Sequence, residues 1–276
     1  SLARSVSLKM TADDLAASWD SVRQEVRSLH QRIFYKPLLS AVSKLDTDNL
    51  ELTSEQVQDR LRAVGFNDPA GALAHISALT SGLFRRASIQ KQLLPVLLQW
   101  FSEGTDPDSA LLAFRRLSED LGESPWYLRM LRDSSGAAER LMKVLSSSAF
   151  IARLLENIPD SSVWFSDEDS LVPLGKDLIL EEMLAILERS VDLEQSAEAL
   201  RQVRRREVLR IASSAVLGAT SISQIAEGLT AVTDAYVISM VALVKQFQQS
   251  ELDFGVVAMG RWGGMELGFG SDADGM

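Results

Sequence analysis

The dominant pattern along this chain is the spacing of apolar residues at three and four positions. That spacing gathers apolar side chains on one face of an α-helix, whereas a strand would need strict alternation. The pattern predicts a mainly α protein, with more than roughly two-thirds of its residues in helices against a usual share of about a third. The predicted core residues in the middle of the chain are Leu111, Phe114, Leu117, Leu121, Leu141, Val144, Leu145, Ile151, Leu154 and Leu155.

Several predicted helices begin with the same local signal, a capping residue followed by proline. The side-chain oxygen accepts from free amides of the first turn, and proline is tolerated at the first helical position. Pro95 lies inside the apolar run 93–101 and either begins a helix or kinks one. We expect a compact group of short helices between residues 53 and 159. The starts are Asp68-Pro69, Asp106-Pro107 and Ser124-Pro125.

The second half of the chain predicts longer helices over residues 178–189, 197–217 and 222–248. Gly218 is a typical helix stop, and either Ser221 or Ser223 can cap the helix that follows. The preceding segment, residues 157–175, contains two prolines, several serines and an acidic cluster. Those features make it the best candidate for a linker.

A single segment, residues 253–259, reads as a strand, because it is short, apolar and contains β-branched Val256 and Val257. Beyond it lies a glycine-rich turn that leads to two aspartates near the C-terminus. The fold class is therefore expected to be mainly α, with multi-helix bundles followed by the beginning of an α/β domain.

Composition narrows the classes of function. The 276 residues carry 38 Asp and Glu against 28 Lys and Arg, a net charge of −10, so no nucleic-acid partner is expected. The absence of cysteine excludes disulfides and thiolate metal sites and fits a reducing cytoplasm. No signal peptide is visible, and the longest apolar stretch, residues 236–244, is too short to span a membrane. A chain that begins with Ser1 and ends within a motif is expected to be a piece of a larger protein.

The C-terminal aspartates are the strongest candidates for chemistry. Asp272 and Asp274 are separated by one residue, a spacing that puts both on the same face of an extended segment, where they can hold one or two divalent metals. The upstream pair Gly263-Gly264 lets a backbone approach a triphosphate closely. This order is typical of a metal-dependent nucleotidyltransferase. The alternative is a solvated acidic turn, which is the more common reading of two such aspartates alone.

The sequence VVAMGRWGGMELGFGSDAD, residues 256–274, closely resembles the active-site motif of the glutamine synthetase adenylyltransferase/adenylyl-removing family. The usual form is GMGKLGGxEL followed by an aromatic-containing stretch and SDxD. Arg261 replaces the usual lysine and Trp262 the leucine, so that the phosphate contact becomes a planar fork. The matching residues are Met259, Gly260, Gly263, Gly264, Glu266, Leu267, Phe269, Ser271, Asp272 and Asp274.

Further segments resemble the same family. Residues 26–42 resemble the end of its first catalytic half, residues 61–79 its helical linker, and residues 204–212 the helix leading into its second half. The resemblance implies three regions: 1–45, the helical end of the first half; 46–175, a helical linker domain; and 176–276, the start of a polymerase-β-like nucleotidyltransferase domain. In this family the second half is the one that transfers AMP, although the two halves are similar to each other.

The resemblance implies Mg²⁺-dependent transfer of AMP from ATP to a tyrosine hydroxyl of glutamine synthetase. Asp272 and Asp274 would be the catalytic metal ligands, and a third carboxylate would come from a later strand. The partners implied are glutamine synthetase and a PII-type signal protein, with glutamine as effector, in the cytoplasm. The alternative is a non-catalytic helical linker that couples regulatory input to the catalytic halves. The amides of Gly263 and Gly264, at the opening of a short helix at Met265, would bind phosphate oxygens. The nucleotide-binding residues implied are Gly260, Arg261, Gly263, Gly264 and Ser271.

Five arginines crowd one predicted helix. Either they form a solvated face that pairs with Glu198 and Glu207 at helical spacing, or Arg206 or Arg210 faces a triphosphate. The two histidines, His30 and His75, lie far apart, and the serine clusters lack an activating base, which disfavours a Ser/His/Asp hydrolase. The arginines are Arg201, Arg204, Arg205, Arg206 and Arg210.

Overall fold

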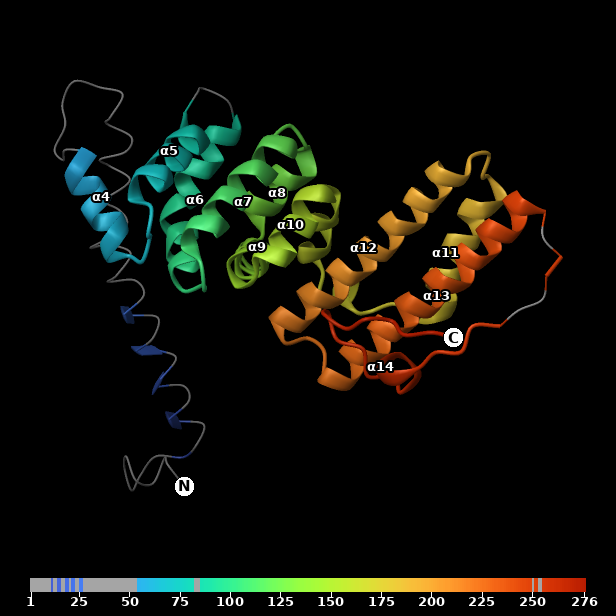
Figure 1. Cartoon of the computed structure of the whole chain (residues 1–276). Coiled ribbons are helices and arrows are strands. Elements are labelled where there is room, and N and C mark those ends of the chain that lie inside the picture. Colours follow the sequence, from blue (N-terminus) through green and yellow to red (C-terminus); the bar gives the residue numbers. More distant parts are fainter. Residues whose placement is uncertain are drawn as a thin grey trace. The chain divides into compact units, whose positions relative to one another are not determined.

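The computed structural model describes residues 54–81, 85–249, 251–252 and 255–276, together with scattered residues between 11 and 26 (Figure 1). Helical residues make up 76% of this part, which confirms the prediction of a mainly α protein. The chain forms two compact units, Ser1–Arg115 and Arg116–Met276. The expected region limits at 45 and 175 stay a prediction, and most of 1–45, with His30 and residues 27–42, lies outside the described residues.

The first unit consists of helices, two of which start at the predicted capping residues Asp68 and Asp106. The Asp68 carboxylate accepts from the amide of Gly71 at 3.0 Å, and Asp106 accepts from the amide of Ser109 at 3.1 Å. Pro95 lies inside a helix and does not begin one. Buried Leu61 and Ile76 are part of the core. The helices are α4 (Ser54–Ala63), α5 (Pro69–Thr80), α6 (Arg85–Ser102) and α7 (Pro107–Asp120), the last of which runs into the second unit.

The second unit begins with three short helices and continues without an extended linker. The segment 157–175 forms two 3₁₀ helices, with Phe165 and Leu171 each 1% exposed. Its serines and acidic residues suggested a linker, but its apolar side chains pack against neighbouring helices. The elements are α8 (Pro125–Asp133), α9 (Ser135–Ser147), α10 (Ala149–Asn157), η2 (Pro159–Ser166) and η3 (Asp169–Leu171).

Three long helices lie side by side and form the main core of this unit (Figure 1). Gly218 ends α12 in the left-handed conformation, with φ 73°, and Ser221 caps α13 in a reciprocal capping box with Gln224. Both boundary predictions are confirmed. The helices are α11 (Lys176–Glu188), α12 (Leu193–Leu217) and α13 (Ile222–Gln248).

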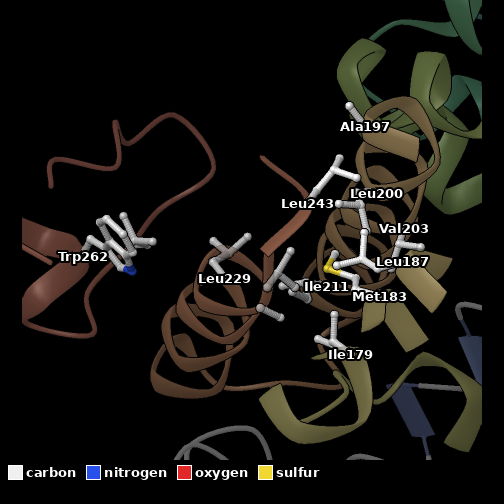
Figure 2. Packing of buried hydrophobic residues seen from close by; sticks show 13 residues of the cluster. Ile179, Met183, Leu187, Ala197, Leu200, Val203, Ile211, Leu229, Leu243 and Trp262 are labelled. Atoms are coloured by element: carbon white, nitrogen blue, oxygen red, sulfur yellow. The ribbon is translucent and has the colours of Figure 1, made fainter. Parts of the chain in front are cut away.

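Helix α13 is long and apolar enough to cross a membrane by length and composition. Part of its apolar surface is buried by packing against neighbouring helices. Leu229, Val232 and Leu243 are buried in a cluster with Met183 of α11 and Leu200 of α12 (Figure 2). A core helix of this length passes the same test of length and composition.

The predicted strand over residues 253–259 is reduced to an isolated antiparallel bridge between Ala258 and Gly275. Residues 253 and 254 lie outside the described part, and the described residues contain no named strand. A lone pair of extended segments is marginal without further strands beside it, because each edge leaves its backbone groups without partners. The beginning of an α/β domain therefore stays a prediction.

Candidate functional site

The glycine-rich turn near the C-terminus is anchored to the helical core by a buried tryptophan. Trp262 lies in the four-residue helix α14 (Gly260–Gly263) and is 6% exposed. Its indole Nε1 donates a 2.8 Å hydrogen bond to Oδ1 of Asp234 on α13. Leu267 joins the same apolar cluster, seen in part in Figure 2. Trp262 and Leu267 therefore hold the glycine-rich turn against the helical core.

The aspartate-containing segment returns antiparallel to the segment before the turn. The amide of Val257 donates to the carbonyl of Met276 at 2.8 Å, and the amide of Met276 donates back at 3.0 Å. The amide of Met259 donates to the carbonyl of Asp274 at 2.8 Å. The backbone of Asp274 is therefore held directly beside the start of the glycine-rich turn.

Two glycines of this turn occupy positions where a side chain would be strained or would collide with the backbone. Gly260 has φ 55°, and a Cβ there would lie 3.4 Å from Oδ2 of Asp274. A Cβ on Gly263 would lie 2.5 Å from the carbonyl oxygen of Ala258, which is closer than real Cβ contacts come. Glycine at these positions therefore allows the close return of the chain that brings Asp274 to the turn.

The amides of Gly263 and Gly264 are already used inside the turn. They donate to the carbonyls of Met259 and Gly260, both at 3.0 Å. We expected a helix to open at Met265, but α14 ends at Gly263, and Met265 has φ 57°. The two amides lie at the end of a helical turn, where amides are paired and carbonyls are left over. In this conformation they are not available to phosphate oxygens, contrary to expectation.

Two other predicted nucleotide-binding residues are brought together. The hydroxyl of Ser271 accepts from the amide of Gly268 at 3.0 Å, and Nη1 of Arg261 lies 3.5 Å from the same oxygen. Arg261 is exposed, so its guanidinium has donors left for a ligand. The arrangement places a cation and a hydroxyl on the loop just before Asp272.

A cavity of about 460 Å³ lies beside this loop, within the second unit. Asp272 and Ser271 line it on one side, and Arg204 and Arg205 of α12 line it on another. Asp274 is not among its lining residues and lies against Gly260. The apolar part of the wall comes from Phe150, Leu154, Val208, Leu229, Leu267 and Phe269.

Asp272 and Asp274 are both exposed carboxylates. Among the described residues, no group of three or more His, Cys, Asp or Glu is placed to hold a metal. A site for a divalent metal would therefore consist of these two aspartates and ligands that the described residues do not supply. Their carboxylate oxygens are the ligands that Mg²⁺ takes, and Mg²⁺ commonly uses one or two carboxylates together with substrate phosphates.

The arginines of α12 have different partners in the structure. Arg201 and Arg205 bond to Glu198 at 2.7 and 3.0 Å, as expected for a solvated face. Arg206 makes two bonds to Glu182 of α11, at 2.7 and 2.5 Å. These bonds lower the pKa of the Glu182 carboxyl and raise that of the Arg206 guanidinium.

Buried Glu207, 1% exposed, links two of these arginines. Its carboxylate accepts from Arg206 at 2.9 Å and from Arg210 at 2.8 Å. Arg210 also stacks over the Trp164 ring at 4.1 Å and donates to the carbonyl of Ser170. Arg206 and Arg210, which we considered as phosphate contacts, thus join α11, α12 and the 3₁₀ segment.

Sequence reasoning missed the aromatic part of the cavity wall. We assigned Leu154 to the core and gave Phe150 no role, yet Phe150 is 43% exposed and lines the cavity with Phe269, which is 44% exposed. More than a hundred residues separate the two phenylalanines in the sequence. No local pattern reports that α10 lies near the C-terminal loop, so only the tertiary fold reveals the pair.

Residues 138–276 match the family model described as "Glutamate-ammonia ligase adenylyltransferase". The chain belongs to this family. The match contains most of α9, all of α10 to α14, the cavity and both aspartates, which is the part of the chain where the candidate site lies.

Curated relatives of the chain are named bifunctional glutamine synthetase adenylyltransferase/adenylyl-removing enzyme. Those from Leifsonia xyli subsp. xyli and Cutibacterium acnes are 53% and 41% identical over 99% of the chain. One from Streptomyces coelicolor is 39% identical over 99% of the chain. The chain spans 28% of the length of the first two relatives and 29% of the third. The resemblance seen in the sequence is confirmed.

Proposed function

We propose that this chain carries the first part of a nucleotidyl-transfer site. In a protein of the relatives' full length, that site transfers AMP from ATP to a tyrosine hydroxyl of glutamine synthetase. The name of the relatives supports the reaction class and the protein acted on. The observation that carries the proposal is the antiparallel return of the chain, which holds Asp274 against the Gly260 turn and puts Asp272 in the cavity wall.

Asp272 and Asp274 would hold Mg²⁺, for which their oxygen donors are suited. When bound, the metal neutralises charge on the triphosphate and orients it for displacement. The chain's own residues orient the carboxylates. The backbone pairing of Met259 with Asp274 fixes one, and the loop between Leu267 and Ser271 fixes the other.

Arg261 and Ser271 are proposed to bind phosphate oxygens of the nucleotide. The guanidinium supplies charge and several N–H donors in a planar fork, which suits phosphate. The hydroxyl of Ser271 already accepts from Gly268, so its own proton is free to be donated outward. Gly260, Gly263 and Gly264 act by allowing close approach of the backbone.

The proposed compartment, partners and effector are those that the family resemblance implies. We propose a cytoplasmic enzyme whose partners are glutamine synthetase and a PII-type signal protein, with glutamine as an effector. The assignment to the AMP-transferring half, as opposed to the removing half, rests on the resemblance of residues 26–42, 61–79 and 204–212 together and is part of the same proposal.

A second candidate is a non-catalytic helical module that passes regulatory input to catalytic domains. The observation that favours it is the first unit, whose described residues between 54 and 115 are mostly helical and precede the range matched by the family model. This role would belong to the first unit, and the nucleotidyl-transfer role to the second.

Labelled ATP distinguishes these roles. A protein of full length is incubated with glutamine synthetase, Mg²⁺ and ATP labelled on either the α or the γ phosphate. Transfer of AMP carries only the α label to glutamine synthetase. Transfer of the γ label would instead indicate phosphorylation. If neither label is transferred, the non-catalytic helical module is the better interpretation.

A further inference from the structure

The cavity beside Asp272 is lined by two chemically different sets of side chains. One set is apolar and aromatic, with exposed Phe150 of α10 and Phe269 of the C-terminal loop. The other set is polar and consists of Arg204, Arg205, Ser271 and Asp272. A volume of about 460 Å³ is within the range of small-molecule sites, which are mostly apolar with a few placed polar groups.

The two arginines that line the cavity are not equivalent. Arg205 shares Glu198 with Arg201, so its charge is partly matched. Arg204 pairs with no carboxylate within the described part of the chain, and its guanidinium lies 5.6 Å from the centre of the Tyr236 ring. A cation–π contact orients a guanidinium without neutralising it. Arg204 therefore offers the least compensated charge at this wall of the cavity.

A polyanion with a flat apolar group matches such a cavity better than a covering protein surface would. Covering it with protein would bury the guanidinium of Arg204 without a carboxylate that pairs with it among the described residues, which is unfavourable. A nucleotide brings phosphate oxygens for the arginine and an aromatic base for the phenylalanines. Bases stack favourably on aromatic side chains.

From this we infer that the cavity is the pocket for the nucleotide, with Arg204 binding its phosphates and Phe150 and Phe269 flanking its base. The inference rests on the proposed function and makes it more specific, because it selects one arginine of α12. It also gives α10 a part in the pocket, although this helix precedes the three long helices by more than 15 residues.

Affinity for a charge series tests the inference independently of transfer to glutamine synthetase. Titration calorimetry measures adenosine, AMP, ADP and ATP binding to the 276-residue chain and to a full-length protein, with Mg²⁺ and without it. Arg204→Ala should weaken ATP binding by about tenfold or more, as expected for loss of a charge-assisted contact. It should leave the affinity for adenosine unchanged, and Arg204→Lys should restore part of the loss.

Phe150→Ala should weaken adenosine and ATP by a similar factor, because a base contact does not depend on phosphate. The matched control is Arg201→Ala on the same helix, whose partner is Glu198 and which does not line the cavity. Absence of ATP binding to the unmodified full-length protein would overturn the inference. So would equal effects of Arg204→Ala and Arg201→Ala. If ATP binds as expected but no α label reaches glutamine synthetase, the pocket stands and the proposed function fails.

Discussion

The indole of Trp262 donates its N–H to the carboxylate of Asp234, at 2.8 Å, and so joins the C-terminal turn to α13. The family's usual residue at this position is leucine, which would fill apolar space without a donor. Asp234 also lies 3.8 Å from Lys176 of α11, so the tryptophan enters an existing polar contact between two helices. The turn that positions Asp274 thereby depends on a residue outside the motif.

Loss of this hydrogen bond should lower stability measurably. Trp262→Phe keeps an aromatic ring but removes the donor, and we expect a decrease of about 1–2 kcal/mol in the free energy of unfolding. Urea denaturation followed by circular dichroism measures it. The double variant with Asp234→Ala should lose less than the sum of the single losses, because both changes remove the same interaction. Additive losses would show that the two side chains act independently.

Gly263→Ala should loosen the antiparallel return of the chain. The added Cβ would lie 2.5 Å from the carbonyl of Ala258, so the backbone must shift. We expect a local cost of about 1–3 kcal/mol, seen as faster hydrogen exchange in the peptide that contains residues 255–276. Gly270→Ala is the control, since its Cβ would meet nothing within 4 Å. Equal exchange in both variants would contradict the steric role of Gly263.

Glu207 should matter more for stability than any exposed acid of α12. It is 1% exposed and holds two guanidinium groups, so Glu207→Ala leaves buried charge without its partner. The expected loss is about 3–5 kcal/mol. Glu198→Ala removes an exposed partner of two arginines and should have a much smaller effect. Thermal melting of both variants makes the comparison, and a larger effect at Glu198 would contradict it.

The pair of Glu182 and Arg206 predicts a dependence of stability on pH. The folded state lowers the pKa of Glu182 below its ordinary value of 4.5, chiefly through the hydrogen bonds from Arg206. Its contribution is therefore present above about pH 4.5 and is lost as the pH falls through the lowered folded value. In urea denaturation, Glu182→Gln should be less stable than the unmodified protein at pH 7, and the gap should narrow as the pH falls below 4.5. A constant gap would contradict the linkage.

Local sequence signals predicted the helices well because their causes are local. Gly218 ends a helix through its left-handed φ, and Ser221 begins one through its hydroxyl. The same reasoning failed for residues 157–175, where polar composition suggested a linker but Phe165 is buried. It also did not show that the amides of Gly263 and Gly264 are bonded within the turn, because the register of one helical turn decides which groups are free. Their part in nucleotide binding stays a prediction.

The candidate site was predicted in part. Asp272 and Ser271 were chosen from the motif, and both line the cavity. Arg204 and Phe150 could not be chosen, because the choice depends on which arginines find carboxylates and on which helix lies near the loop. Such facts come from contacts between distant parts of the chain, and spacing along the sequence does not contain them.

The central claim is that Asp272 and Asp274 form the metal-binding part of a nucleotidyl-transfer site. In a full-length protein, Asp272→Asn combined with Asp274→Asn is expected to abolish transfer of α-labelled AMP to glutamine synthetase at saturating ATP and Mg²⁺. Both side chains are exposed, so the melting temperature should stay nearly unchanged, and removing two like charges relieves repulsion. Loss of transfer with a collapsed melting temperature would show that the pair is structural. Full transfer by the folded double variant would contradict the claim.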